Sequence, residues 1–311
     1  MTVTLGIDLG GTKVQVVALT NRRVVGESRH PTPQSDAKAV IDEMIAAARE
    51  AAGSADVRAI GVGTPGSITP DGHVSKAANV PGFIHDVPLG PSLSQAFGGV
   101  PVAVDNDVRA ASMGEFHRGA GRPYRDLLGV FVGTGVGGGL ILDGKLRRGR
   151  GSAGEIGHTV VKDGGRECTC GRRGCLEAYA GRLSIERAAK RKQSDGAKTV
   201  LFEIMERKGR DRVTSSVIAD ALDKGDDLTH SLIDQAVEAL GIALGNAQNT
   251  LDMEAIIVGG GLGDRLGQPF VRRVADAMQP RLRVPEHAPV VLPTQLGDLS
   301  GAVGAAVIAG G

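Results

Sequence analysis

The chain has 311 residues, 41% of them hydrophobic, which is more than one hydrophobic core usually holds and therefore predicts two domains. Its 36 lysines and arginines nearly balance its 35 aspartates and glutamates, so no overall charge attracts nucleic acid or an anionic membrane. No apolar run approaches the ~20 residues that cross a bilayer, and the first residues do not resemble a signal peptide. We expect no nucleic-acid partner and no membrane partner.

The first half of the chain is expected to alternate strands with helices. Hydrophobic periodicity predicts strands over residues 3–8, 13–20, 23–29, 59–64 and 100–104, and helices over residues 37–53 and 108–118. The turn at residues 9–12, between the first two strands, is typical of a hairpin.

The second half repeats this plan approximately. It predicts strands over residues 127–132, 139–142, 255–258 and 290–292, and helices over residues 176–192, 213–223, 228–251 and 301–309. A second glycine turn, residues 133–138, lies between two of these strands, which suggests a duplicated α/β unit. The stretch 117–123, with glycine, arginine and a proline, is the candidate linker.

Glycine clusters follow three predicted strands, at residues 10–11, 133–139 and 259–263. In the first, Asp8 ends the strand, and Gly10, Gly11, Thr12 and Lys13 follow it. Exposed backbone amides in such a turn bind anions, and a nearby carboxylate holds Mg²⁺ through water. An ordinary glycine hairpin is the alternative interpretation.

The second cluster contains the pattern GxGxxG, which alone is a weak sign of a dinucleotide site. Residues 140–142 are expected to form a strand, whereas the dinucleotide fingerprint opens a helix. The fingerprint also needs an acidic residue ~20 positions further on, at the end of a second strand, and this sequence has none in such a place. We therefore exclude NAD binding, and the absence of GxxxxGK[ST] excludes a Walker loop. The third cluster either passes beneath a nucleotide base or forms a plain strand-to-helix turn.

An acidic turn, Asp105, Asn106 and Asp107, closes one predicted strand and begins a helix. The helix N-terminus favours the ionised carboxylate. Such a carboxylate can accept the proton of a sugar hydroxyl that attacks a γ-phosphate, while the asparagine orients the sugar. By local sequence alone, an aspartate helix cap with an Asx turn is the favoured interpretation.

The three cysteines and one histidine fall in a short stretch, His158, Cys168, Cys170 and Cys175. Three thiolates and an imidazole make a closed tetrahedral set of the kind that holds structural zinc. Gly171 and Gly174 allow the tight turns of such a loop. Three free buried thiols are the alternative. An odd, clustered set of cysteines is a poor disulfide framework, so the chain is expected in the reducing cytoplasm.

Two carboxylates flank the cysteine cluster, Glu155 and Glu177. A surface position is the ordinary interpretation of each. Their place beside a rigid metal loop makes contact with sugar hydroxyls the competing one.

Six segments together resemble the ROK family of bacterial sugar kinases and repressors: residues 8–13, 79–83, 106–107, 133–139, 155–158 and 168–177. The resemblance covers nearly the whole chain, in the family's order. It implies an α/β, actin-like (ribonuclease H-like) sugar kinase fold of two domains with a cleft between them. We expect a small domain over residues 1–117, completed by a C-terminal helix at about 299–311, and a large domain over residues 118–298 that carries the zinc loop.

Carried over by position, the resemblance makes Asp107 the general base for the sugar 6-hydroxyl. The expected sugar-binding residues are Asn79, Asn106, Asp107, Glu155, His158 and Glu177. The expected donor-binding residues, with Asp8 near Mg²⁺, are Asp8, Gly10, Gly11, Thr12, Lys13, Gly133, Thr134, Gly135, Gly260 and Gly261. His158 is expected to serve both zinc and sugar. The sequence departs from many relatives at Arg109, where they have asparagine.

The resemblance implies ATP–Mg-dependent phosphorylation of a hexose, most simply glucose. Other acceptors stay open, namely N-acetylmannosamine, N-acetylglucosamine, fructose and allose, and polyphosphate stays open as a donor. A sugar-responsive transcriptional regulator is the alternative of another class, but such repressors carry a helix-turn-helix before the first phosphate loop, which here begins at Asp8. Relatives are commonly dimers or tetramers, so a homo-oligomer is expected. We also expect zinc removal to raise the KM for the sugar more than the KM for ATP, because the loops at Gly10 and Gly133 lie outside the cysteine stretch.

Overall fold

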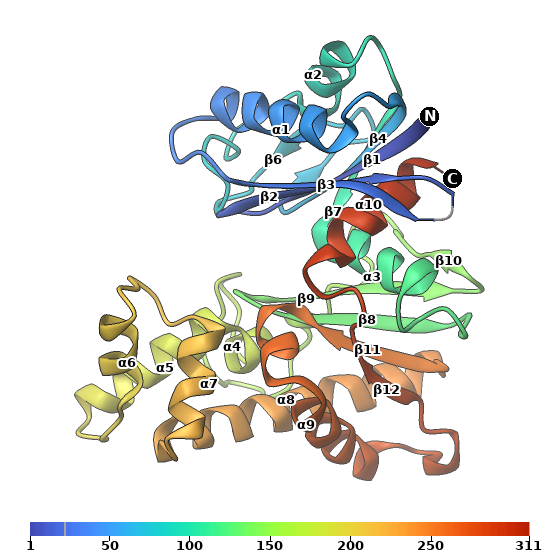
Figure 1. Cartoon of the computed structure of the whole chain (residues 1–311). Coiled ribbons are helices and arrows are strands. Elements are labelled where there is room, and N and C mark those ends of the chain that lie inside the picture. The colour runs from blue at the N-terminus through green and yellow to red at the C-terminus, as the bar shows by residue number, and fades with distance from the viewer. Residues whose placement is uncertain (22, 311) are drawn as a thin grey trace. The chain divides into compact units, whose positions relative to one another are not determined.

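The computed structural model describes residues 1–21 and 23–310, and its chain divides into two compact α/β units (Figure 1). Unit 1 comprises Met1–Pro123, Gly139–Ala153 and the C-terminal stretch from Gln295, and unit 2 comprises Tyr124–Gly138 and Gly154–Thr294. Among the described residues, no helix is long and apolar enough to cross a membrane.

Unit 1 contains a five-stranded sheet with the order β3-β2-β1-β4-β7. Its strands are β1 (Thr2–Leu9), β2 (Lys13–Leu19), β3 (Val24–Pro31), β4 (Asp56–Thr64) and β7 (Val102–Asn106). The pairs β1–β2 and β2–β3 are antiparallel, whereas β1–β4 and β4–β7 are parallel. The first three strands therefore form a meander, which includes the predicted hairpin between β1 and β2. The carboxyl ends of β1, β4 and β7 share one edge of the sheet.

Four helices accompany this sheet: α1 (Ala37–Ala52), α2 (Leu89–Ala96), α3 (Asp107–Arg118) and α10 (Ser300–Gly310). Helix α1 lies on one face of the sheet, and α10 lies on the other against α3, β1 and β4 (Figure 1). The small residues of α10 make this packing very close. A Cβ on Gly6 would lie 1.9 Å from the carbonyl oxygen of Ala302, and one on Gly61 would lie 1.8 Å from that of Ala305. The predicted C-terminal helix is thus present, although its expected last residue, Gly311, lies outside the described residues.

The second sheet has the order β10-β9-β8-β11-β12. Its strands are β8 (Leu127–Val132), β9 (Val136–Leu142), β10 (Lys145–Leu146), β11 (Ala255–Gly259) and β12 (Val290–Pro293). The division between the two units falls within β9. Strand β11 pairs in parallel with both β8 and β12, so the carboxyl ends of these three strands also share one edge. A small antiparallel pair in unit 1 completes the strands, β5 (Ser67–Ile68) with β6 (Val74–Ser75).

The helices of unit 2 are α4 (Glu177–Ala180), α5 (Arg182–Ser194), α6 (Leu201–Arg207), α7 (Ser215–Asp223), α8 (Asp227–Leu251) and α9 (Gly260–Met278). Four short 3₁₀ turns lie at Ile156–His158, Gln279–Arg281, Pro285–His287 and Gly297–Leu299. Helix α8 packs against α9, α4 and α5, and it buries apolar side chains such as Leu232, Leu240 and Leu244 along its length.

The sequence-based prediction of one helix over residues 176–192 was wrong. Gly181 has ψ near 134°, so the chain leaves helical geometry there and α4 and α5 are separate. The strand predicted to begin at residue 139 begins at Val136. Helices α2, α6 and α9 were not predicted. In α9, glycines fill the first turn, Gly267 has a φ of 61° and Pro269 follows it, which hides the helical periodicity.

Candidate functional site

The first glycine turn is a hairpin between β1 and β2. The Gly10 amide donates to the Lys13 carbonyl at 2.9 Å, and the Thr32 hydroxyl donates to the Gly10 carbonyl at 2.7 Å. A Cβ on Gly11 would lie 2.2 Å from the carbonyl oxygen of Asn79, so only glycine lets these two segments touch. The structure therefore brings the predicted donor loop and the predicted sugar ligand Asn79 together within unit 1.

Asp8 stands at the end of β1, behind this hairpin, and retains partial solvent exposure. Packing around its carboxylate, and next the negative charge of Asp107, raise its pKa from 3.8 to about 7. Lys13 opposes this shift but is itself paired with Asp298, at 3.1 Å. A bound cation would stabilise the ionised form of a carboxylate that is partly buried beside another carboxylate, and this agrees with the predicted place of Mg²⁺.

Replacing Asp8 by asparagine is expected to stabilise the fold at neutral pH. Because the folded-state pKa is raised, the folded chain holds more protons than the unfolded chain between about pH 4 and pH 7, so wild-type stability falls as the pH rises through that window. Asparagine cannot ionise and escapes this loss, which is on the order of a few kcal/mol by pH 8. Urea unfolding at pH 4 and pH 8 measures the difference. Asp56→Asn, an exposed aspartate of β4, is the control, and parallel pH profiles for Asp8→Asn and wild type would contradict the prediction.

The acidic turn joins β7 to α3. Asn106 is the N-cap of α3, and its side-chain oxygen accepts from the amides of Val108 and Arg109 at 3.0 and 3.1 Å. Its side-chain amide donates to Asp107 Oδ1 at 2.9 Å, and the Val108 amide donates to the same oxygen at 2.9 Å. The cap is thus the asparagine rather than an aspartate, and Asp107 is the first helical residue, where the helix dipole favours its charge.

Asp105, the first residue of the acidic turn, is buried and pairs with two arginines. Its Oδ1 accepts from Arg109 Nε at 2.6 Å, and its Oδ2 accepts from Arg148 Nε at 2.7 Å. Arg109 also donates to the Gly151 carbonyl at 2.8 Å. The departure at Arg109 therefore ties the turn to the 148–151 loop, in a network that the sequence analysis did not foresee because Arg148 lies 43 positions from Asp105.

The four predicted metal ligands converge in unit 2. One ligand atom each from His158, Cys168, Cys170 and Cys175 lie within 4.8 Å of one another. Cys168 Sγ is 3.7 Å from His158 Nδ1, and Cys170 Sγ is 3.8 Å from Cys175 Sγ. Zinc–sulfur bonds of ~2.3 Å in a tetrahedron place sulfur atoms about 3.7 Å apart, so the spacing and the donor set both fit zinc.

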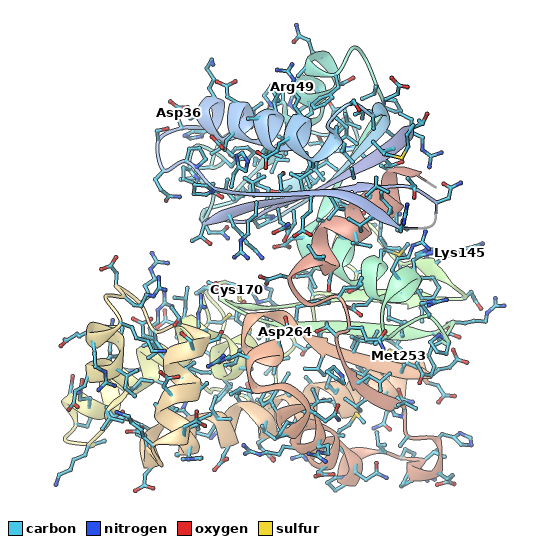
Figure 2. The ribbon with its side chains drawn as sticks, viewed as in Figure 1. Asp36, Arg49, Lys145, Cys170, Met253 and Asp264 are labelled. Carbon is cyan, nitrogen blue, oxygen red and sulfur yellow. The ribbon has the colours of Figure 1, made fainter. Side chains whose placement is uncertain are left out.

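The loop around these ligands is held by its own backbone. The amide of Cys168 donates to the Arg172 carbonyl at 2.8 Å, and Gly174 donates to Arg166 at 2.8 Å. Gly171 and Gly174 have φ angles of 85° and 82°, as the sequence predicted for tight turns. Cys170 is exposed on this loop (Figure 2), whereas Cys168 and Cys175 are buried.

The second glycine turn joins β8 to β9 and lies against the segment that follows the cysteines. The Val136 amide donates to Glu177 Oε2 at 3.0 Å, while the other oxygen of Glu177 accepts from the Thr169 hydroxyl at 2.8 Å. The Arg182 side chain donates to the Thr134 hydroxyl at 2.9 Å. The Gly133 loop lies outside the cysteine stretch in the sequence, as expected, but Glu177 contacts both segments.

The third glycine cluster forms the turn from β11 into the start of α9, a position that both interpretations of it allow. Gly260 has a φ of 80°, and a Cβ there would lie 2.8 Å from the Val132 amide nitrogen. A Cβ on Gly133 would lie 3.9 Å from the Gly261 nitrogen. The second and third glycine clusters are thus neighbours at the carboxyl ends of β8 and β11, which is where open α/β sheets bind ligands.

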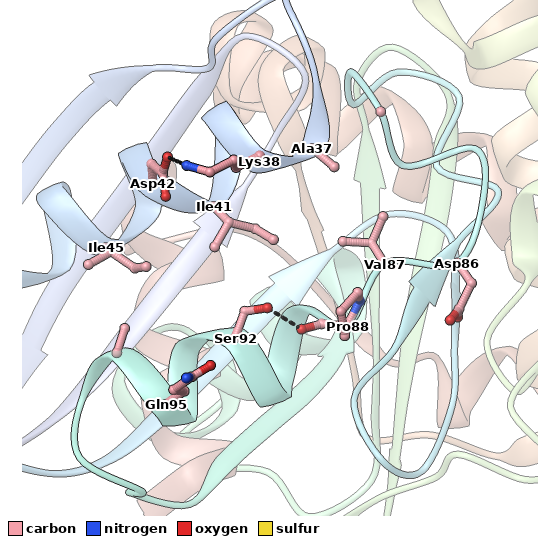
Figure 3. A pocket seen from close by; sticks show the side chains of 12 residues that line it. Ala37, Lys38, Ile41, Asp42, Ile45, Asp86, Val87, Pro88, Ser92 and Gln95 are labelled. Carbon is pink, nitrogen blue, oxygen red and sulfur yellow. Dashed lines mark hydrogen bonds and ion pairs between the residues drawn. The ribbon is translucent and has the colours of Figure 1, made fainter.

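A hollow of about 550 Å³ lies between α1 and α2, with Ile41, Ile45 and Pro88 among its lining residues (Figure 3). None of the predicted sugar, donor or metal residues lines it. The predicted site residues fall into two groups, each within one unit: Asp8, Asn79 and Asp107 in unit 1, and the second and third glycine clusters with the metal loop in unit 2.

Comparison with known proteins identifies this arrangement. The fold is the actin-like fold of sugar kinases, because the chain matches a glucokinase of that fold from Streptomyces griseus, solved with glucose and AMPPNP, with a TM-score of 0.83 and 33% identity over 99% of both chains. The ROK family profile matches residues 4–311. The chain therefore belongs to the ROK family.

Curated relatives carry two different sugar kinase names. A glucokinase of Halalkalibacterium halodurans is 35% identical over 313 residues, which cover 96% of this chain and 92% of that protein. An N-acetylmannosamine kinase of Vibrio cholerae is 32% identical over 289 residues, which cover 92% of each chain.

Proposed function

We propose that this chain is an ATP-dependent hexokinase that transfers the γ-phosphoryl group of ATP–Mg to the 6-hydroxyl of a hexose, with glucose as its main acceptor. The observation that carries the proposal is the position of Asp107. Its carboxylate is fixed at the N-terminus of α3 by Asn106 and Val108, and its charge acts on Asp8 beside the first glycine hairpin. The glucokinase names among close relatives favour glucose over the amino sugars.

Asp107 accepts the proton of the 6-hydroxyl as the hydroxyl oxygen attacks the γ-phosphorus, while the bond from that phosphorus to the bridging oxygen breaks and ADP leaves. The residues proposed to bind the other hydroxyls are Asn79, Asn106, Glu155, His158 and Glu177. The residues proposed to bind the donor are Asp8, Gly10, Gly11, Thr12, Lys13, Gly133, Thr134, Gly135, Gly260 and Gly261. Magnesium, when bound with ATP near Asp8, neutralises charge on the phosphates.

We assign zinc to the four-residue cluster, because three thiolates and an imidazole are a donor set that zinc prefers. The zinc would be structural, since four protein ligands leave no open position for catalysis. The imidazole atom nearest Cys168 is Nδ1, so Nε2 of His158 is the nitrogen left to face a sugar hydroxyl. The metal would hold the loop between His158 and Glu177, and through it the direction of both side chains.

The proposal also covers the domains, the location in the cell, the oligomeric state and the substrates. The small domain comprises residues 1–117 with the C-terminal helix, and the large domain comprises residues 118–298. The enzyme works in the cytoplasm as a homo-oligomer, a dimer or a tetramer. It acts on hexose and ATP as small-molecule substrates.

A coupled assay of purified protein with a panel of acceptors and donors tests the function. The acceptors are glucose, N-acetylmannosamine, N-acetylglucosamine, fructose and allose, and the donors are ATP, GTP and polyphosphate. We expect the highest kcat/KM with glucose and ATP. A higher kcat/KM for an amino sugar would show that the amino sugar, not glucose, is the main acceptor. A higher kcat/KM for polyphosphate would show that polyphosphate, not ATP, is the main donor. No phosphorylation of any hexose would reject the proposal.

A further inference from the structure

Two side chains of unit 2 adjoin the glycine clusters at the carboxyl ends of β8 and β11 and have no role in the preceding account. They are Arg182, at the start of α5, and Ser215, the first residue of α7. Among the described residues, three buried side-chain polar atoms lack a hydrogen-bond partner, and two of these are Arg182 Nε and Ser215 Oγ. Buried polar atoms are rarely left unpaired in folded proteins, so both positions point to a ligand.

Arg182 is fixed against the second glycine turn at two points. Its backbone amide donates to the Gly133 carbonyl at 3.0 Å, and its guanidinium donates to the Thr134 hydroxyl at 2.9 Å. Burial and the nearby charge of Arg212 lower its pKa, while Glu186 opposes this. A half-buried cation beside a hydroxyl and a glycine turn is stabilised by an anion, and the planar guanidinium is suited to phosphate oxygens.

Ser215 lies on the other side of the paired glycine clusters. It is 8% exposed, and a Cβ on Gly261 would lie 3.5 Å from its hydroxyl oxygen. Helix α7, which it begins, packs against α9, which begins at Gly260. The helix cap is the preceding residue, Thr214, whose hydroxyl accepts from the Val217 amide. The Ser215 hydroxyl is therefore not needed to begin α7.

The contacts form one continuous path through unit 2. Arg182 touches Thr134, Gly133 approaches Gly261, and Gly261 approaches Ser215. The Arg182 guanidinium lies at one end of this path, beside the glycine turn between β8 and β9. The neutral Ser215 hydroxyl lies at the other end, beside the start of α9. A charged end and a neutral end match the phosphate tail and the nucleoside of one molecule.

We propose that Arg182 and Ser215 form a donor subsite in which the guanidinium binds the phosphate tail of a nucleoside triphosphate and the Ser215 hydroxyl binds its nucleoside part. The proposal rests on the kinase function proposed above and deepens it. Arg182 serves any polyphosphorylated donor, whereas Ser215 serves only a donor that carries a nucleoside. Ser215 thus contributes to the preference for ATP over inorganic polyphosphate.

The test measures binding by calorimetry, without sugar, for two probes: a non-hydrolysable ATP analogue with magnesium, and tripolyphosphate with magnesium. Arg182→Gln is expected to weaken both probes by about 10- to 100-fold, because a hydrogen bond to a charged group is lost. Ser215→Ala is expected to weaken the ATP analogue by about three- to tenfold and to leave tripolyphosphate within about twofold.

Two controls accompany the variants. Arg187→Gln removes the same charge from an exposed position of α5, and Ser216→Ala removes the next hydroxyl of α7, which contacts Thr214 at 3.0 Å. Both controls should bind the probes as wild type does. Should Arg182→Gln fail to fold, Arg182→Lys takes its place, with an expected loss of about three- to tenfold, because one ammonium replaces the guanidinium fork.

The outcomes separate this subsite from the kinase function. Normal binding of the ATP analogue by Ser215→Ala, or an equal loss for both probes, would overturn the role of Ser215. Normal binding by the Arg182 variant would overturn its role, and a wild-type chain that binds neither probe would overturn the subsite. If wild type phosphorylates no hexose but the variants bind as expected, the function fails and the subsite stands.

Discussion

Replacing Asp107 by asparagine is expected to lower kcat by about 10²- to 10⁴-fold, which is the usual effect of losing a general base, while the Kd for the sugar stays nearly unchanged. Asparagine keeps the side-chain shape, and its oxygen can still accept from Asn106 Nδ2 and the Val108 amide, as Asp107 Oδ1 does at 2.9 Å. The start of α3 should therefore persist. Single-turnover kinetics with calorimetric sugar binding measures both quantities.

A second aspartate offers a matched control for Asp107→Asn. Asp227 is also the first residue of a helix, α8, and it is exposed. Asp227→Asn removes the same favourable charge from a helix N-terminus, worth roughly 0.3–1 kcal/mol of stability, without any place in the site. A near-normal kcat for Asp107→Asn would show that Asp107, like Asp227, only stabilises its helix.

Local sequence patterns predicted those parts of the fold and site that depend on neighbours in the chain. Strand β8 begins and ends where its apolar run does, at Leu127 and Val132. The metal ligands were recognised because cysteine spacing is itself the signal, and the structure brings all four together. Helix α9 was missed because glycines and Pro269 interrupt its pattern, and its helical geometry depends on packing against α8 and β12.

The contacts that were missed join residues far apart in sequence. No residue close to Arg182 in the sequence indicates that its guanidinium donates to Thr134, 48 positions earlier. The proximity of Ser215 to Gly261 has no local signal either. Glu177 was singled out because it follows a cysteine, but its bond to the Val136 amide, across 41 positions, was not foreseen.

Removing zinc, by chelation or by Cys175→Ser, is expected to raise the KM for ATP as well as the KM for the sugar. The sequence alone suggested a larger effect on the KM for the sugar, but the contacts of Glu177 now predict an effect on both. One of its oxygens holds the Thr169 hydroxyl of the metal loop, and the other holds the Val136 amide of the second glycine turn. A loop that loses its metal no longer fixes Glu177, so the disturbance passes to the donor turn.

The variant Thr169→Val separates this route from general loosening of the loop. It deletes the 2.8 Å hydrogen bond to Glu177 but none of the four ligands, so metal analysis should still find about one zinc per chain. Its KM for ATP should nevertheless rise about three- to tenfold, since a hydrogen bond to a carboxylate is lost. If chelation moves only the KM for the sugar, and Thr169→Val leaves the KM for ATP in place, Glu177 does not transmit the state of the metal to the donor turn. The metal loop would then serve the sugar alone, as the spacing of Glu155, His158 and Glu177 first suggested.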